Sequence, residues 1–368
     1  MSIYWNERTR RLLPYIPGEQ PRDRKFIKLN TNENPYPPSP LVIEAIQKAA
    51  GETLRLYPDP ACTELREAAA ARYGIKQEQV FAGNGSDEVL AFAFAAFFGA
   101  GGKELLFPDI TYSFYPVYAD LWDIPYRTVP LKSDFSIDVP AFLEPVSLGK
   151  SGGIILPNPN APTGMALPLE ALRRLAEAAE RNRNVFVVDE AYIAFAGGEG
   201  VATALSLIDE FPNLLIVRTF SKEASLAGLR VGLALGAAEL IEGLCRIRDS
   251  FNSYTLDRLA LAGAAAALKD ASYYEEINRR VIATRRRISA GLEALAFRVL
   301  PSQTNFLFAA PPETSGKSGQ EFFAALRERG ILVRHFNKPR IADYLRISMG
   351  TDEDMDVFLD ACSEIVKN

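Results

Sequence analysis

Between residues 104 and 236 the chain alternates short apolar segments with helical ones, and this alternation is the feature that most constrains its fold. The apolar segments include LLF, GGIIL, VFVVD and NLLIV, and an amphipathic segment, LEALRRLAEAAERN, separates two of them. Continuous apolar strands separated by helices are typical of a mainly parallel sheet that helices cover on both faces. GLRVGLALG follows NLLIV so closely that it could be an antiparallel neighbour. We therefore predict an α/β fold.

The pattern changes after residue 256. A long helical stretch covers residues 257–296, and FRVLPSQTNFLFAA, ILVRHF and YLRISMG then predict strands. Further helices are expected at about 318–329 and from residue 352 on. This order predicts a smaller α+β C-terminal domain with an antiparallel sheet.

A chain of 368 residues is long enough for one large domain and a smaller one. We expect an N-terminal arm with one short helix over residues 1–30, associated with the small domain. The large domain is expected over residues 31–255 and the small domain over residues 256–368. The helix near 255–275 could bridge the two domains.

Composition narrows the classes of function. A net charge of -5 gives no hint of a nucleic-acid partner, which would require a basic face. The N-terminus lacks an apolar core of signal-peptide length, and the apolar run VLAFAFAAFFGAGG is too short to span a membrane. Cys62, Cys245 and Cys362 are far apart and fit reduced thiols, so we expect a cytoplasmic protein. The single histidine, His335, gives a Ser-His-Asp triad or a histidine-rich metal site almost nothing to build on, and we expect no metal.

One lysine, Lys222, stands just past the end of the NLLIV strand, within RTFSKEASLAGLR (residues 218–230). Open α/β sheets place their ligands at the carboxyl ends of strands. A lysine in that position can attack a carbonyl group and form a Schiff base. Most lysines are simply solvated at the surface, so this interpretation depends on the rest of the chain.

Two further motifs lie at strand ends. GNGSDE (residues 83–88) precedes a helix, where glycine uncovers backbone N–H groups that can bind phosphate. It is not a dinucleotide fingerprint, because Glu88 stands where the third glycine belongs; a plain turn with a helix cap is the alternative. DEAY (residues 189–192) ends the VFVVD strand, and Asp189 could bind a protonated ring nitrogen or merely cap a turn.

A lysine, an aspartate and a phosphate cradle are together what pyridoxal phosphate requires. Asp189 would keep the ring nitrogen protonated. Lys222, once displaced by the substrate amine, would move a proton between the substrate Cα atom and the C4′ atom of the cofactor. Its amine must then be partly neutral, so we expect desolvation or cationic neighbours to lower its pKa. Arg230 beside the phosphate fits bidentate recognition.

Nine motifs occur in the order and at the intervals of one known family: NENPYPP, LYPDP, GNGSDE, PDITYSFY, PNPNAPTG, VVDEAY, RTFSK, LAGLRVG and YLRISMGT. Over nearly its whole length the chain resembles the fold-type I aminotransferases, and among them the histidinol-phosphate aminotransferase group. The resemblance implies the following cofactor contacts: Gly85, Ser86, Ser221 and Arg230 at the phosphate, Tyr112 stacked on the ring, Asp189 at the ring nitrogen, Tyr192 at the phenolic oxygen, and Lys222 as the Schiff-base lysine. Lys222, Asp189 and Tyr192 are the expected catalytic residues.

The same resemblance implies contacts beyond one chain's cofactor. Tyr57 would reach the phosphate of the neighbouring subunit's cofactor, so we expect a homodimer with shared active sites. Arg346 would pair with the substrate α-carboxylate, and Arg334 and Tyr15 would help bind the substrate phosphate. Apart from the resemblance, a packed tyrosine at position 57 and a surface ion pair at Arg346 are the alternatives.

The chain departs from the family pattern at two places. The family has an asparagine immediately before PTG, at the cofactor's phenolic oxygen, and this chain has Ala161. Asn160 could replace it if the loop shifts. After the lysine the family has a small residue and then a large apolar or aromatic one, whereas this chain has Glu223 and Ala224. A carboxylate there could point outward, pair with an arginine, or indicate a different substrate pocket.

The resemblance implies transamination of L-histidinol phosphate with 2-oxoglutarate, which gives imidazole acetol phosphate and L-glutamate in histidine biosynthesis. Alternatives from the same group are an aminotransferase for aromatic amino acids and a lyase similar to threonine-phosphate decarboxylases. The choice between deprotonation and decarboxylation depends on which Cα bond stands perpendicular to the cofactor ring. A non-catalytic pyridoxal-phosphate-binding regulator is disfavoured, because no basic helical module precedes the fold.

Overall fold

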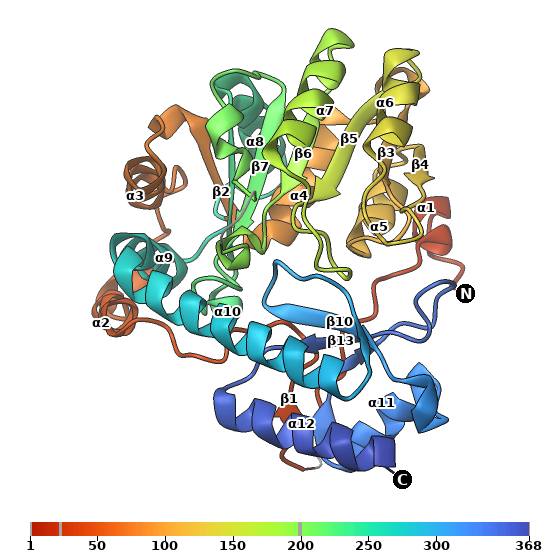
Figure 1. Cartoon of the computed structure of the whole chain (residues 1–368). Coiled ribbons are helices and arrows are strands. Elements are labelled where there is room, and N and C mark those ends of the chain that lie inside the picture. The colour runs from red at the N-terminus through yellow and green to blue at the C-terminus, as the bar shows by residue number, and fades with distance from the viewer. Residues whose placement is uncertain (1, 22–23, 198–200, 368) are drawn as a thin grey trace.

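The computed structural model describes residues 2–21, 24–197 and 201–367, so parts of the predicted arm (residues 1 and 22–23) and residue 368 of the predicted small domain lie outside it. A seven-stranded sheet forms the centre of the larger part of the molecule (Figure 1). Its strands lie in the order β2-β8-β7-β6-β5-β3-β4. The strands are β2 (Val80–Asn84), β3 (Glu104–Pro108), β4 (Tyr126–Val129), β5 (Ser151–Pro157), β6 (Phe186–Asp189), β7 (Leu214–Thr219) and β8 (Val231–Gly236).

The pairing confirms the predicted α/β sheet. β3 to β7 pair in parallel, while β8 runs antiparallel to both β7 and β2. GLRVGLALG is thus the antiparallel neighbour of NLLIV, as its short connection suggested. Alternate residues of one strand enter different cores: in β6, Val188 packs on one side of the sheet and Val187 on the other. Both faces are therefore buried, which explains why these strands are continuously apolar.

Helices cover both faces of this sheet (Figure 1). One face packs against α4 (Gly85–Phe97), α5 (Phe114–Leu121) and α8 (Ala238–Phe251). The other face packs against α3 (Thr63–Tyr73), α6 (Val139–Ser147), α7 (Leu169–Arg181) and α9 (Arg258–Lys269), with α2 (Pro40–Ala49) lying on α9. Among the described helices, none combines the length and the apolarity needed to cross a lipid bilayer.

A second, smaller sheet confirms the predicted antiparallel one. Its order is β12-β13-β10-β9, and a separate parallel pair joins β1 to β11. These strands are β9 (Arg298–Val299), β10 (Phe306–Ala310), β12 (Arg334–His335), β13 (Leu345–Ser348), β1 (Ile27–Lys28) and β11 (Ile331–Leu332). Three helices accompany them: α10 (Ala271–Ala294), α11 (Gly319–Glu328) and α12 (Asp352–Lys367).

The single helical stretch predicted over residues 257–296 is two helices. α9 ends at Lys269 and α10 begins at Ala271, because Asp270 leaves the helical conformation (φ −105°, ψ 52°). Its carboxylate accepts a hydrogen bond of 2.5 Å from Ser39, the N-cap of α2. α10 then crosses the molecule: Ile277 packs in a core of the large sheet, and Ile288 in the core of the small one.

The N-terminal arm contains the expected short helix, α1 (Glu7–Arg11), capped by Asn6. The arm, which we expected to associate with the small domain, contacts both parts of the molecule. Arg8 pairs with Asp123 just after α5 at 2.7 Å. Only later does the arm reach the smaller part of the molecule, where β1 pairs with β11. The reason is electrostatic, because the basic last turn of α1 lies against a carboxylate of the large part.

Candidate active site

A cavity of about 260 Å³ lies between the carboxyl ends of the large sheet's strands and the small sheet. It brings together ten of the predicted site residues: Tyr15, Ser86, Tyr112, Asp189, Tyr192, Ser221, Lys222, Arg230, Arg334 and Arg346. Gly85 adjoins it at the start of α4, whereas Asn160 and Tyr57 lie outside its lining. No group of three or more His, Cys, Asp or Glu side chains within the described ranges is placed to hold a metal ion.

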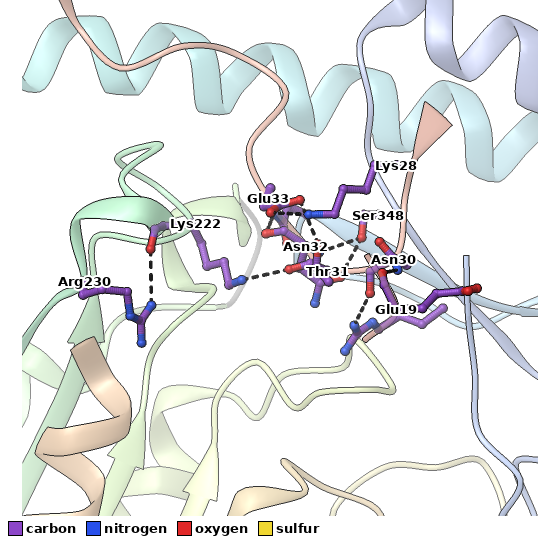
Figure 2. A network of polar contacts seen from close by, with 12 residues as sticks. Glu19, Lys28, Asn30, Thr31, Asn32, Glu33, Lys222, Arg230 and Ser348 are labelled. Carbon is purple, nitrogen blue, oxygen red and sulfur yellow. Dashed lines mark hydrogen bonds and ion pairs between the residues drawn. The ribbon is translucent and has the colours of Figure 1, made fainter. Parts of the chain in front are cut away.

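Lys222 enters the cavity three residues after β7 ends. Its Nζ atom donates a 3.0 Å hydrogen bond to the carbonyl oxygen of Thr31 (Figure 2). Burial lowers the pKa of the amine to about 8, and the nearby guanidinium of Arg346 adds to the effect. A lysine with this pKa is partly neutral near pH 8, which a nucleophile or a proton carrier requires.

Asp189 stands at the carboxyl end of β6 and is buried. Its Oδ2 atom accepts a hydrogen bond from the hydroxyl of Tyr115 (3.1 Å), and its Oδ1 atom accepts one from the backbone N–H of Ala191 (3.2 Å). Burial raises the pKa of this carboxyl group to about 7, although both hydrogen bonds oppose the shift. A buried carboxylate held by neutral donors would gain greatly from a cationic partner, and a protonated ring nitrogen is such a partner.

An anion site forms where α4 begins. Gly85 has a φ of +77°, and a Cβ atom there would lie 2.6 Å from Nη2 of Arg230. Gly232, on β8, is equally constrained, because its Cβ atom would lie 2.4 Å from the backbone nitrogen of Ser86. Arg230 also reaches Ser221, with 3.5 Å between Nη1 and Oγ. Backbone N–H groups at a helix start, two hydroxyl groups and a guanidinium together suit a phosphate group.

Asp87 links this anion site to Tyr112. Its two carboxylate oxygens accept hydrogen bonds from the Tyr112 hydroxyl (2.7 Å) and from Arg230 (2.9 Å). Burial raises the pKa of Tyr112 well above its ordinary value, and Asp87 adds to the effect. Sequence reasoning missed Asp87, although an acidic residue in the first turn of a phosphate-binding helix was a usable signal.

Two arginines form a second anion site at the other end of the cavity. Arg334 and Arg346 are paired residues of the antiparallel strands β12 and β13. Among the described residues neither makes an ion pair, and the buried Nε atom of Arg346 has no hydrogen-bond partner. Burial lowers the pKa of Arg346, and Arg334 adds to the effect. Like charges directly opposite each other on neighbouring strands are destabilising unless an anion compensates them.

Tyr15 lies beside the two arginines, packed on Phe114 with 4.3 Å between the ring centroids. It lines the cavity together with them. The distal end of the cavity is thus assembled from the N-terminal arm and from the small sheet.

A segment that the predicted site did not include crosses the cavity, from Asn30 to Asn32 (Figure 2). The carbonyl oxygen of Asn30 accepts a 2.9 Å hydrogen bond from Arg346, and that of Thr31 accepts the Lys222 bond. The side-chain amide of Asn32 donates to the Tyr192 hydroxyl at 2.9 Å. This segment entered the sequence-based prediction only through the motif NENPYPP, and none of its residues was assigned to the site. Its dense asparagines were the available signal, since asparagine side chains readily bond backbone and neighbouring groups.

The structure corrects the hypothesis about Asn160. Its Nδ2 atom donates to the carbonyl of Ile110 and to Thr163, both at 3.0 Å, and its Oδ1 atom accepts from Thr111. The side chain is therefore fully engaged inside its own loop. Ala161 lines the cavity instead, so Asn160 does not replace the missing amide.

Tyr57 lies at the surface, 78% exposed, with its ring stacked on Tyr254 at 4.6 Å. It is available to another molecule and does not contact this chain's own cavity. Glu223 faces a separate cavity of about 680 Å³ behind the lysine loop, and Ala224 is buried in a core of the large sheet. Neither of these two residues lines the Lys222 cavity.

This architecture, with a lysine and a buried aspartate at neighbouring strand ends, defines a fold-type I aminotransferase. The chain belongs to the aminotransferase class I and II family, whose model matches residues 24–362. It is 51% identical over 366 residues to the histidinol-phosphate aminotransferase of Clostridium acetobutylicum, with 100% of both chains covered. It is 54% identical over 365 residues to histidinol-phosphate aminotransferase 1 of Bordetella parapertussis, with 99% of both covered.

A solved structure shows the same relationship. The crystal structure of histidinol-phosphate aminotransferase from Sinorhizobium meliloti, in complex with pyridoxal-5'-phosphate, superposes with a TM-score of 0.89. It is 27% identical, and the match covers 100% of this chain and 98% of that one. The chain is therefore an enzyme of the aminotransferase family.

Proposed function

We propose that the protein transfers the amino group of L-histidinol phosphate to 2-oxoglutarate, giving imidazole acetol phosphate and L-glutamate, with pyridoxal 5'-phosphate as cofactor. The observation that supports the proposal is that one cavity is lined by Lys222 and by two groups of residues that suit anions. One is built at the start of α4, for a cofactor phosphate. The other consists of Arg334 and Arg346 with Tyr15, for the anionic group of a substrate.

The residues present fit this cofactor. Ser86, Ser221 and Arg230 would hold its phosphate at the start of α4, and Tyr112 would stack on its ring. Asp189 would accept a hydrogen bond from its protonated ring nitrogen, and Tyr192 would donate one to its phenolic oxygen. When bound, the cofactor supplies an aldehyde and an electron-accepting ring that make the substrate Cα–H bond acidic.

Lys222 carries the reaction's proton. Its amine would hold the cofactor covalently and would be free once a substrate amine takes its place. The freed amine is partly neutral, because its pKa is lowered to about 8, so it can take the proton from the substrate Cα atom and return it one carbon away. Asn34 fixes the lysine loop by donating to the carbonyl oxygen of Lys222 at 3.1 Å.

The two arginines suit a pair of substrates with different anions. L-Glutamate carries an α-carboxylate, for which Arg346 offers a guanidinium whose Nε atom has no hydrogen-bond partner among the described residues. L-Histidinol phosphate carries a phosphate ester on the carbon next to the amine-bearing one, and a phosphate dianion needs more positive charge than a carboxylate. Arg334 and Tyr15 supply the additional contacts.

A product assay tests the proposal. Purified protein loaded with pyridoxal phosphate is mixed with L-histidinol phosphate and 2-oxoglutarate, and L-glutamate and imidazole acetol phosphate are quantified by mass spectrometry. Both should appear in equal amounts, and Lys222→Ala should form neither. If threonine phosphate released carbon dioxide, the protein would be a lyase. If aromatic amino acids were the better donors, the proposed donor would be wrong.

We also propose a cytoplasmic homodimer in which Tyr57 reaches the partner's cofactor phosphate. An exposed apolar surface around Tyr57 supports this proposal; it comprises Leu54, Leu56, Tyr57, Phe251 and Tyr254. Exposed aromatic and aliphatic groups of this kind mark protein interfaces. The three cysteines are free thiols, consistent with a reducing compartment.

Finally, we propose two domains with their boundary inside α10. α9 packs on α2 and α3 of the large part, which favours a boundary later than residue 256. The first half of α10 packs in the large core and the second half in the small core. Limited proteolysis would place the boundary experimentally.

A further inference from the structure

At Ala161, the wall of the Lys222 cavity has no side chain that could donate a hydrogen bond to a ligand. Ala161 stands there with a methyl group, and the neighbouring Asn160 has its amide engaged inside its loop. Tyr192, from the segment after β6, also lines the cavity and carries a hydroxyl group. The direction in which this hydroxyl donates its one proton therefore decides what the cavity offers a ligand's oxygen atom.

Asn32 controls that direction. Its Nδ2 atom lies 2.9 Å from the Tyr192 hydroxyl oxygen and donates to it. A phenol has one proton to donate and can accept hydrogen bonds on its oxygen. When Asn32 donates to that oxygen, the phenolic proton is left free to point elsewhere. Burial raises the pKa of Tyr192, so the group stays neutral and keeps its proton.

The orientation of Asn32 is itself fixed, by the small sheet (Figure 2). Ser348, at the end of β13, donates to Oδ1 of Asn32 at 2.8 Å and accepts from its backbone N–H at 2.9 Å. Asn305 donates to the carbonyl oxygen of Asn32 at 3.0 Å. Asn32 is buried and has a φ of +55°, a left-handed conformation that asparagine tolerates better than most residues. With Oδ1 committed to Ser348, Nδ2 faces Tyr192.

We propose that Asn32 is a positioning residue that directs the proton of Tyr192 into the cavity. This inference rests on the proposed function, because the oxygen that receives the proton is the phenolic oxygen of the bound pyridoxal phosphate. Asn32 thus supplies, through Tyr192, the donor that the wall at Ala161 lacks. The arrangement also makes that donor dependent on the small sheet, since Ser348 fixes the side-chain amide of Asn32.

The test uses the holoenzyme without any substrate. A hydrogen bond donated to the phenolic oxygen stabilises its deprotonated form, so it lowers the pH midpoint of the cofactor's visible absorbance. Asn32→Ala should raise this midpoint by about 0.5 to 1 pH unit. Asn32→Asp should raise it further, because a carboxylate would take the phenolic proton for itself. Asn305→Ala, which removes only the bond to the Asn32 carbonyl, should leave the midpoint within about 0.2 unit of the wild type.

A double-mutant cycle separates direct from indirect effects. In a Tyr192→Phe background, Asn32→Ala should no longer move the midpoint. An equal shift in both backgrounds, or no shift in either, would overturn the inference. Thermal unfolding of the cofactor-free variants provides a second readout: if Asn32→Ala and Asn305→Ala lower the melting temperature equally and neither moves the midpoint, the role of Asn32 is structural alone.

The inference and the proposed function fail in different ways. A wild-type protein that shows the visible absorbance band but does not use histidinol phosphate would contradict the proposed substrate and leave the role of Asn32 intact. A wild-type protein with no such band would contradict both.

Discussion

The amine of Lys222 lies 3.0 Å from the carbonyl oxygen of Thr31, a residue that precedes it by 191 positions. The partner is a neutral main-chain atom, so the amine is held in place while burial keeps its pKa near 8. We therefore expect cofactor-free protein to capture pyridoxal phosphate faster as the pH rises through about 8, followed by stopped-flow absorbance. Lys222→Ala should capture none covalently, whereas Lys269→Ala, at a surface ion pair with Glu64, should behave as the wild type. A capture rate independent of pH between 7 and 9 would contradict the lowered pKa.

Asp189 should destabilise the cofactor-free protein at alkaline pH. Its folded pKa of about 7 lies above the unfolded value of about 3.9. Between these values the folded state binds a proton that the unfolded state has lost, so the stability contributed by protonation is present at low pH and is lost as the pH rises through about 7. Asp189→Asn has no such dependence.

The free energies of unfolding of the wild type and Asp189→Asn can be compared by urea unfolding at several pH values. Relative to wild type, cofactor-free Asp189→Asn should gain stability from pH 5 to pH 8, by about 2.5 kcal/mol. The same variant should lose activity about 100-fold or more, because the ring nitrogen loses its charged partner. Asp360→Asn, at an exposed position on α12, should change neither quantity. A stability difference that stays constant with pH would argue against a buried, titrating Asp189.

Gly232→Ala should weaken cofactor binding on the order of 100-fold. A Cβ atom at this position would lie 2.4 Å from the backbone nitrogen of Ser86 and 2.5 Å from the carbonyl carbon of Gly85, so α4 must move away from β8. Equilibrium binding of pyridoxal phosphate measures the effect. Gly228→Ala is the matched control, because nothing lies within 4 Å of its added Cβ atom. Equal affinities for the two variants would show that the start of α4 does not bind the phosphate.

Arg334→Gln should discriminate between the two half-reactions. We expect KM for histidinol phosphate to rise about 10-fold or more, with a smaller rise for glutamate, which retains Arg346 for its carboxylate. Steady-state kinetics with each donor gives the ratio. Arg181→Gln, at a surface i,i+4 pair with Glu177, should leave both values unchanged. Equal increases in KM for both donors would mean that Arg334 does not distinguish the phosphate of one donor from the carboxylate of the other.

Heterodimers test the shared site. In a dimer of one Tyr57→Phe subunit and one Lys222→Ala subunit, the remaining Lys222 would receive an intact Tyr57 from its partner. That site should bind pyridoxal phosphate with wild-type affinity, while the Tyr57→Phe homodimer should bind it about 10-fold more weakly. Differently tagged subunits allow the heterodimer to be purified. If its affinity matched that of the Tyr57→Phe homodimer, Tyr57 would not act across the interface.

The fold was largely predictable because its signals are local. Apolar runs such as VFVVD predict a strand that is buried on both faces of the sheet. The close spacing of NLLIV and GLRVGLALG predicted that β8 runs antiparallel to β7. The break at Asp270 was not predictable, because helix formers flank it. It arises from the contact with Ser39, a residue distant in sequence.

The site residues likewise divide into those that the sequence identified and those that only the folded structure reveals. Lys222 and Asp189 stand at strand ends, where sequence alone indicates ligand chemistry, and both line the cavity. Asn160 was wrongly chosen, because nothing in PNPNAPTG shows that Ile110 and Thr163 take its amide. Asn32 was missed for a similar reason: its partners, Ser348 and Tyr192, become neighbours only when the small sheet packs on the large one.

The segment from Asn30 to Asn32 has an evolutionary consequence. Arg346 and Lys222 bind the carbonyl oxygens of Asn30 and Thr31, which every amino acid carries. A substitution at either position therefore keeps both carbonyl acceptors, provided that the backbone conformation does not change. The side chains of Asn30 and Thr31 bond Glu19 and Glu33. The side chain of Asn32 instead reaches the cavity, where it donates to Tyr192. The two bonds to Arg346 and Lys222 therefore do not depend on which side chains stand at positions 30 and 31, whereas the bond to Tyr192 is inherited only together with the side chain at position 32.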